Sequence, residues 1–511
     1  MTKQVSNDKK IGIFSKFLNG IEKVGNKLPD PVMIFFILCA IIMVISLFMS
    51  NAGISVIHPG TKETLKAMNL LSVDQLKIYL GSFVGNFQNF PPLGLVLVVM
   101  MGAGIAEKTK FMETAMRSSV IGLPKQLLTF MIFFIGICAN AAGDAGFIIL
   151  PPLAAIMFLS TGRSPIVGIF AAFAGVAAGF SANLVVNLLD VLLASFTLPA
   201  AQTIDPNIAL SATMNWYFLA ASTLILTIAG TLVTEKIVAP RFENDKYVTD
   251  NKSHELTEIT HVEKKALKKA YISVLIYVVV IVAACLVPIN GKPFMVGSTG
   301  SLLESDAPFM TGIVPLITFL FFIPGLVYGI ASKQIRKSSD AVRLVEKSLS
   351  EMGGYILLAF AASQFIALFN QSNIGIILAV KGAEFLRSVG LTGGPLFVSF
   401  IIFCGIVNLF IGSSSAKWAM LAPIFIPMFM LLGYDPAATQ MAYRIGDSIT
   451  NPISPLFPYF PMVVGFASKY KKDIGMGTII SSMLPYSIVF GIIWIIMFLI
   501  FFYLGLPFGP A

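Results

Sequence analysis

Long apolar runs, each close to the length of a membrane-spanning helix, recur along this chain of 511 residues. A helix needs about 20 residues to cross the hydrocarbon core of a bilayer. Runs that approach this length occupy residues 31–50, 93–107, 213–234, 270–288, 310–331, 353–371 and 476–503. The pattern predicts an all-α polytopic membrane protein.

Two other apolar regions, 126–200 and 394–468, are interrupted repeatedly by Gly, Pro, Ser, Asn and Asp. Each is too long for two plain helices and too broken for three. Irregular backbone is tolerated at membrane depth only where protein or a water-filled cavity satisfies its polar groups. We therefore expect each region to hold a re-entrant hairpin followed by a broken helix.

The positions of Lys and Arg predict the orientation of the spans. The segments 1–30, 108–125, 236–269, 333–347 and 469–472 hold 26 of the 35 basic residues, whereas the connections on the opposite side hold six. Because cytoplasmic loops carry the excess of Lys and Arg, we expect a cytoplasmic N-terminus. The same asymmetry accounts for most of the net charge of +9 without a nucleic-acid partner.

With this orientation, each broken region makes one net crossing. The first is expected to form a hairpin at about 126–160, opening to the cytoplasm, and a broken helix at about 165–200. The second does so in the reverse direction, with a hairpin at about 394–432 and a broken helix at about 436–468. The prediction is nine transmembrane helices plus two re-entrant hairpins, with the C-terminus in the periplasm.

An internal repeat supports this topology. At an offset of 271 residues, Gly162-Arg163-Ser164-Pro165 matches Gly433-Tyr434-Asp435-Pro436, and Gly175 matches Gly446. Since the two copies have opposite predicted orientations, we interpret them as inverted structural repeats, an architecture of many secondary transporters. The expected organisation is an N-terminal arm (1–30), a first repeat (31–235), a cytoplasmic loop with a linking helix (236–309), a second repeat (310–503) and a periplasmic tail (504–511).

Other classes of function are disfavoured by composition. The four cysteines and three histidines are scattered, so a disulfide framework, a metal site or a histidine-based triad is not expected. The sequence contains no Gly-x-x-x-x-Gly-Lys motif for a nucleotide. An intramembrane enzyme would need a nucleophile with a base, and no such set is visible. A passive channel is disfavoured by the inverted repeat, which favours alternating access.

The tip of the second hairpin contains the first group of candidate residues. Ser413, Ser414 and Ser415 suit a helix N-terminus, where they cap free N–H groups and where the helix dipole attracts carboxylates; capping alone is the alternative. Trp418 offers a flat face for stacking on an aromatic ring, or it is an interfacial anchor. The role of Lys417 stays open.

Arg444 and Asp447 are three residues apart, and therefore neighbours on one helix face. They either form an ion pair within the helix or place a cation for an anionic substrate beside a titratable group. The segment Thr450-Asn451-Pro452-Ile453-Ser454-Pro455 then breaks the helix, because proline removes N–H donors and frees upstream carbonyls. These carbonyls could coordinate a ligand or a cation.

In the first repeat, Asn140 and Asp144 hold the comparable place at a hairpin tip, either as caps or as ligands. The break runs from Ser181-Ala182-Asn183 to Asn187 and is followed by Asp190. A lone carboxylate in an apolar run is a candidate proton carrier or Na⁺ ligand. The alternative is an aspartate at the membrane edge.

These features closely resemble the AbgT family of p-aminobenzoyl-glutamate transporters. The motifs that carry the resemblance are Gly25-Asn26-Lys27-Leu28-Pro29-Asp30-Pro31, Ala178-Gly179-Phe180-Ser181-Ala182-Asn183-Leu184, Ser414-Ser415-Ala416-Lys417-Trp418 with Ala422-Pro423-Ile424-Phe425, and Tyr443-Arg444-Ile445-Gly446-Asp447-Ser448. The resemblance implies a homodimer in the bacterial inner membrane, transport of p-aminobenzoyl-glutamate and, in some members, export of sulfonamide antimetabolites. Carried over by position, the functional residues would be Asp190, Asn408, Ser415, Trp418, Pro436, Arg444, Asp447 and Pro455.

The sequence therefore predicts an ion-gradient-driven secondary transporter of p-aminobenzoyl-glutamate-like carboxylates, or an exporter of sulfonamides, without a cofactor. We hypothesise that Asp190 and Asp447, with Asp144, couple transport to protons. The alternative is a sodium-coupled carboxylate importer with Na⁺ near Asn183, Asp190 and Asn451. Because Lys417, Trp418 and Arg444 occur only in the second repeat, we expect that repeat to recognise the substrate.

Overall fold

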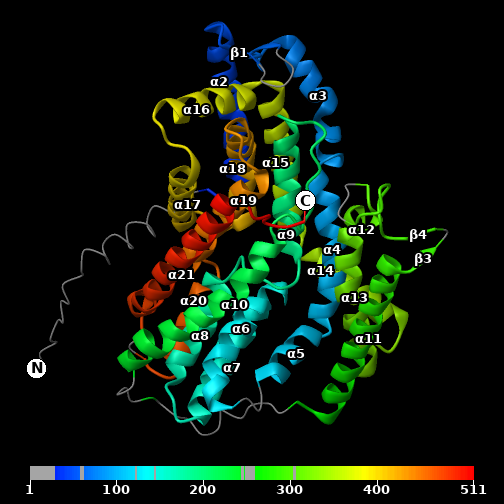
Figure 1. The fold of residues 1–511 in the computed structure, drawn as a ribbon, viewed down its shortest axis with the longest axis vertical. Helices are drawn as coiled ribbons and strands as arrows, with labels where there is room; N and C mark the ends of the chain where they lie inside the picture. Colours follow the sequence, from blue (N-terminus) through cyan, green and yellow to red (C-terminus); the bar gives the residue numbers. More distant parts are fainter. Residues whose placement is uncertain are drawn as a thin grey trace, which may run out of the picture.

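The computed structural model describes residues 29–57, 63–120, 124–142, 145–242, 247, 259–289, 291–302, 306–472 and 474–510. Within these ranges the protein is almost entirely helical (Figure 1), and nine helices are long and apolar enough to cross a membrane. Two of the nine are the arms of the second predicted hairpin, while the broken helices consist of shorter pieces. The all-α polytopic fold is confirmed.

The N-terminal quarter supplies two long helical columns. Asp30 caps the first helix by accepting a hydrogen bond from the backbone N–H of Val32 at 2.8 Å, and Pro31 suits the first helical position. A polar helix that the apolar pattern did not reveal, α3, runs into the predicted span. The elements are α2 (Pro31–Asn51), an antiparallel hairpin of β1 (Ser55–Ile57) and β2 (Thr64–Lys66), α3 (Val73–Gln88), α4 (Pro91–Lys108) and α5 (Phe111–Val120).

The region 126–200 forms four helices joined by short breaks. The first pair is α6 (Leu128–Cys138) and α7 (Ala145–Ser160), and the second is α8 (Pro165–Ala178) and α9 (Leu188–Gln202). Helices therefore occupy both the expected hairpin and the expected broken helix. The chain then continues through α10 (Trp216–Val233), a π-helical turn at Thr234–Val238 and a 3-10 turn at Ala239–Phe242.

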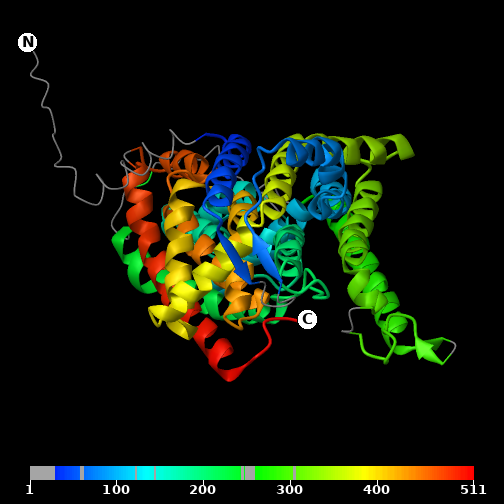
Figure 2. The ribbon, with the colours of Figure 1, turned by 90° about the horizontal axis from the view of Figure 1, so that it is seen from above.

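Two helices stand at one side of the molecule, in green in Figure 2. They are α11 (His261–Leu286) and α13 (Ile313–Ala331), which pack against each other. The Glu-Lys-Lys-Ala-Leu-Lys-Lys run, which lies in the basic segment 236–269, forms the first turns of α11. Between them lie β3 (Pro288–Ile289), β4 (Lys292–Pro293) and α12 (Pro308–Thr311), and α14 (Ser338–Ser350) follows.

The C-terminal part repeats the hairpin and the break. After α15 (Gly353–Gln371), an unexpected helix α16 (Ile374–Ser388) lies between the predicted span 353–371 and the second predicted hairpin. Next come α17 (Gly393–Phe410), α18 (Ser414–Leu431), α19 (Pro436–Thr450), a 3-10 turn at Asn451–Ile453, α20 (Phe460–Ser468) and α21 (Met476–Leu504). The order α17–α18–α19–α20 thus matches α6–α7–α8–α9, whereas the exact limits of the two repeats stay a prediction.

A glycine contact recurs at the same place in both halves. In the first half, a Cβ at Gly175 on α8 would lie 3.5 Å from the Cα of Gly136 on α6. In the second, a Cβ at Gly446 on α19 would lie 2.3 Å from the carbonyl oxygen of Ile401 on α17. Gly175 and Gly446 are related by the 271-residue offset. Small residues let membrane helices approach closely. The first helix of each broken pair therefore packs closely against the first helix of its hairpin at this point.

Gly446→Ala is therefore expected to destabilise the protein. The added methyl group meets backbone on α17, which cannot rotate aside, and overpacking of this kind costs roughly 1–3 kcal/mol. Thermal unfolding of the purified protein in detergent would measure the effect. Gly465→Ala is the matched control, because a Cβ there meets nothing within 4 Å. Equal melting temperatures for the two variants would contradict the prediction.

Candidate functional site

Two buried ion pairs lie where the broken helices meet. Arg444 Nη2 on α19 is 2.7 Å from Asp190 Oδ1 on α9, and Lys417 Nζ on α18 is 2.5 Å from Asp447 Oδ1 on α19. All four side chains are at most 2% exposed. The alternative of an ion pair within α19 is wrong, because Arg444 and Asp447 bind partners on different helices. Side chains three residues apart still point in directions that differ enough to meet separate neighbours.

Asp190 is held by the first turn of α9. Its Oδ2 accepts a hydrogen bond from the backbone N–H of Asn187 at 2.7 Å, while Asn187 Oδ1 accepts from the N–H of Asp190 at 3.3 Å. This reciprocal capping box satisfies donors at the helix start, and the positive end of the helix favours a carboxylate there. The expectation of a lone carboxylate is corrected, because Asp190 both caps α9 and pairs with Arg444.

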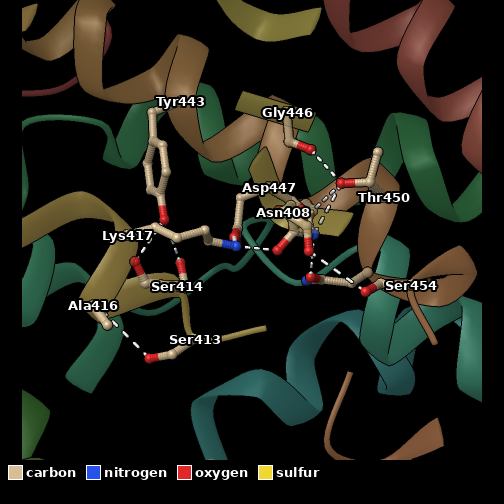
Figure 3. Close-up of polar contacts among 12 residues, drawn as sticks. Asn408, Ser413, Ser414, Ala416, Lys417, Tyr443, Gly446, Asp447, Thr450 and Ser454 are labelled. Atoms are coloured by element: carbon tan, nitrogen blue, oxygen red, sulfur yellow. Dashed lines mark hydrogen bonds and ion pairs between the residues drawn. The ribbon is translucent and has the colours of Figure 1, made fainter. Parts of the chain in front are cut away.

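Asn408, near the end of α17, organises the second ion pair (Figure 3). Its Nδ2 donates to the backbone oxygen of Asp447 at 2.8 Å, to Thr450 Oγ1 at 2.9 Å and to Asn451 Oδ1 at 2.8 Å. Its Oδ1 accepts a hydrogen bond from Lys417. The amide therefore joins the hairpin to the second break and presents one oxygen to the ammonium group.

Trp418 links α18 to α9. Its ring stacks on Tyr443 with centroids 4.6 Å apart, and its Nε1 donates to Thr197 Oγ1 at 2.9 Å. The side chain is fully buried. Stacking of the indole on a substrate ring stays a prediction, and it requires Trp418 and Tyr443 to separate from the arrangement seen here.

A polar chain beside the tryptophan was missed by sequence reasoning. Gln440 Nε2 donates to Thr197 Oγ1 at 2.8 Å, and Asn215 Nδ2 donates to Gln440 Oε1 at 2.6 Å. All three residues are buried. The available signal was their polarity next to or within apolar helices, because polar side chains buried at membrane depth need partners.

The two breaks touch each other directly. The backbone N–H of Ser181 in the first break donates to Ser448 Oγ at 3.1 Å, and Asn451 Nδ2 in the second break donates to the backbone oxygen of Ala177 at 3.4 Å. Between them, Asn183 is 3% exposed and its Oδ1 accepts from the N–H of Val185 at 3.3 Å. The structure thus brings the predicted break residues to one place.

The remaining predicted residues lie at helix starts and in the second break. Ser413 caps α18 by accepting from the N–H of Ala416 at 3.4 Å, and Pro436 begins α19, so both positions follow helix-capping rules. Ser414 and Ser415 open α18, while Pro452 is buried and Pro455 half-buried in the break. Asn140 Nδ2 donates to the backbone oxygens of Ile137 and Val176, whereas Asp144 lies outside the described residues.

Several buried polar atoms of the site have no hydrogen-bond partner within the described chain. They include Asp447 Oδ2, Arg444 Nε and Asn183 Nδ2. Such atoms are rare in native interiors and need an explanation. Both acceptors and donors are represented, so the arrangement can receive a polar ligand or bound water. A separate pocket of about 250 Å³ lies on the neighbouring face of α9, next to Val191, Ala194 and Leu198.

Comparisons with known proteins match the chain along nearly its whole length. A model of the AbgT putative transporter family matches residues 16–511. The p-aminobenzoyl-glutamate transport protein of Escherichia coli (strain K12) is 38% identical over 496 residues, which is 97% of this chain and 96% of the relative. The YdaH transporter of Alcanivorax borkumensis, whose topology is described as unusual, aligns with a TM-score of 0.89 at 38% identity, covering 94% of this chain and 100% of that one. MtrF of Neisseria gonorrhoeae, presented as one of a class of antimetabolite efflux pumps, aligns with a TM-score of 0.90 at 42% identity, covering 97% and 99%.

Proposed function

Because this chain belongs to the AbgT family of multi-pass membrane transporters, we propose that it carries p-aminobenzoyl-glutamate-like aromatic carboxylates together with protons. The relative from Escherichia coli is a p-aminobenzoyl-glutamate transport protein, and MtrF belongs to a class of antimetabolite efflux pumps. Sulfonamides, which share the aminophenyl ring, are the second proposed cargo. The protein would work as a homodimer in the bacterial inner membrane.

The buried pair of Arg444 and Asp190 carries this proposal. A guanidinium keeps its charge in a protein and binds carboxylates through a planar fork of donors. In the present conformation Asp190 occupies that position at 2.7 Å, and the pair is sealed from water. A substrate carboxylate can replace Asp190 at Arg444 only if the negative charge of the displaced aspartate is compensated in another way.

Protonation of Asp190 meets that requirement. An isolated ionised carboxylate is very costly to bury, whereas the neutral acid costs far less. A proton that binds Asp190 would release Arg444 for the substrate, and loss of that proton would return Arg444 to Asp190. Substrate and proton binding therefore favour each other through one ion pair, which supports proton coupling over a carrier driven by substrate alone.

Flux in proteoliposomes tests the proposal. We expect p-aminobenzoyl-glutamate to accumulate against its gradient when a pH gradient is imposed, and a sulfonamide to respond to the same gradient. Replacing sodium with choline should leave both fluxes unchanged. A flux that follows the sodium gradient and ignores pH would favour the sodium-coupled alternative, and downhill leakage alone would contradict coupled transport. Protein-free vesicles and the Asp190→Asn variant are the controls.

A further inference from the structure

The site contains two cations and two carboxylates, and the proposed function uses only one pair. Lys417 lies in the first turn of α18, with its ammonium group fully buried. The N-terminal end of a helix carries partial positive charge, so this place disfavours a cation and favours an anion. Asp447 supplies that anion, and its Oδ2 has no hydrogen-bond partner within the described chain.

We propose that Lys417 is a second carboxylate-binding cation and that the preferred substrate is a dianion, taken up at Arg444 and Lys417 together. This inference rests on the proposed function. Asp190 and Asp447 then hold the places of the two substrate carboxylates in the substrate-free protein. Each aspartate must bind one proton when a substrate carboxylate replaces it, so two protons balance the two negative charges.

The spacing of the two pairs fits one small dicarboxylate. Arg444 and Asp447 are three residues apart on α19, so their backbone positions lie about 4.5 Å apart along the axis of that helix. The two carboxylates of a glutamyl group are separated by a chain of similar length. A monocarboxylate could satisfy Arg444 but would leave Lys417 paired with Asp447.

The surroundings of Asp447 do not offer it another permanent cation. The charged and titratable groups that face it are Lys417 from α18 and Cys404 from α17, with Tyr443 and Arg444 on its own helix. Arg444 itself binds Asp190 from α9. The nitrogen of the Asn408 amide bonds the backbone oxygen of Asp447, Thr450 Oγ1 and Asn451 Oδ1. Its oxygen therefore contacts the ammonium group of Lys417 independently of the Asp447 carboxylate.

The test compares two substrates that differ by one carboxylate, p-aminobenzoyl-glutamate and p-aminobenzoyl-glycine, in proteoliposomes. The variant Lys417→Gln/Asp447→Asn removes both charges of the pair, so the site stays neutral. We expect its preference for the dianion, as a ratio of kcat/KM values, to fall about tenfold or more. Lys108→Gln is the matched control, because Lys108 pairs with Glu351 away from the site.

A second measurement needs no variant. If two protons accompany each dianion, wild-type flux of p-aminobenzoyl-glutamate should not respond to an imposed membrane potential. One proton per dianion would move net charge, and the flux would then follow the potential and overturn the inference. An unchanged substrate preference in the double variant would also overturn it. These outcomes differ from failure of the proposed function, in which the wild-type protein carries neither compound.

Discussion

Asp190→Asn is expected to abolish proton-coupled transport and to destabilise the folded protein by about 3–5 kcal/mol. Asp190 binds Arg444 at 2.7 Å, with both side chains at most 2% exposed. Asparagine retains an oxygen that can accept the N–H of Asn187, so the cap of α9 survives in part. It cannot compensate a guanidinium that never loses its proton. Thermal unfolding in detergent and flux under a pH gradient would measure the two losses.

The double variant Asp190→Asn/Arg444→Gln separates these two effects. It leaves no buried charge at this pair, so we expect most of the lost stability to return. Transport should remain absent, because the proton site and the carboxylate site of this pair are both lost. Recovery of transport together with stability would show that the pair acts only in folding. Normal transport and unchanged pH dependence in Asp190→Asn alone would refute the assignment of Asp190 to proton coupling.

Apolar periodicity predicted the helical architecture well where spans are long and plain. The runs 31–50, 353–371 and 476–503 became α2, α15 and α21 with ends within a few residues. The helices α3 and α16 do not follow from this reasoning, because polar and charged residues interrupt their short apolar stretches. The basic run before 270 likewise does not belong to an apolar run, although it forms the first turns of α11.

Polar groups are costly to place in hydrocarbon, so polar residues within apolar runs are candidates for the site. This criterion identifies the residues but does not predict which residues they contact. It singled out Asp190, Arg444 and Asp447, which the structure brings together at the two breaks. It could not say that Arg444 binds Asp190, because the partner lies 254 positions earlier in the chain. Lys417 is an unusual cation within an apolar run, but only its contact with Asp447 in the structure indicates its role.

Both repeats supply charged residues to the site, although the two hairpins are not equivalent. Lys417 in the second repeat corresponds, at the 271-residue offset, to Gly146 in the first. A Cβ at Gly146 would lie 2.8 Å from the Cβ of Ala139, so the first hairpin has no room for a comparable side chain. The first half instead supplies Asp190, which completes a site whose cations all come from the second half.

Arg444→Gln is expected to change substrate preference more than stability. The variant leaves Asp190 without its cation, but a buried carboxyl can become neutral by binding a proton, whereas the arginine left by Asp190→Asn cannot lose its charge. The glutamate conjugate loses a charge-assisted contact of about 1.5–3 kcal/mol, so its kcat/KM should fall roughly 10- to 100-fold. Sulfonamides lack the glutamate carboxylates, so their transport should change much less.

Parallel flux assays of p-aminobenzoyl-glutamate and a sulfonamide would measure this difference in one preparation. Arg163→Gln is the matched control, because Arg163 pairs with Glu235 at 2.7 Å in a partly exposed position away from the two breaks. Trp418→Ala should reduce transport of both compounds, because both contain the aminophenyl ring. Equal losses for the two compounds in Arg444→Gln would mean that Arg444 serves the coupling step alone, and the carboxylate would then have to bind elsewhere.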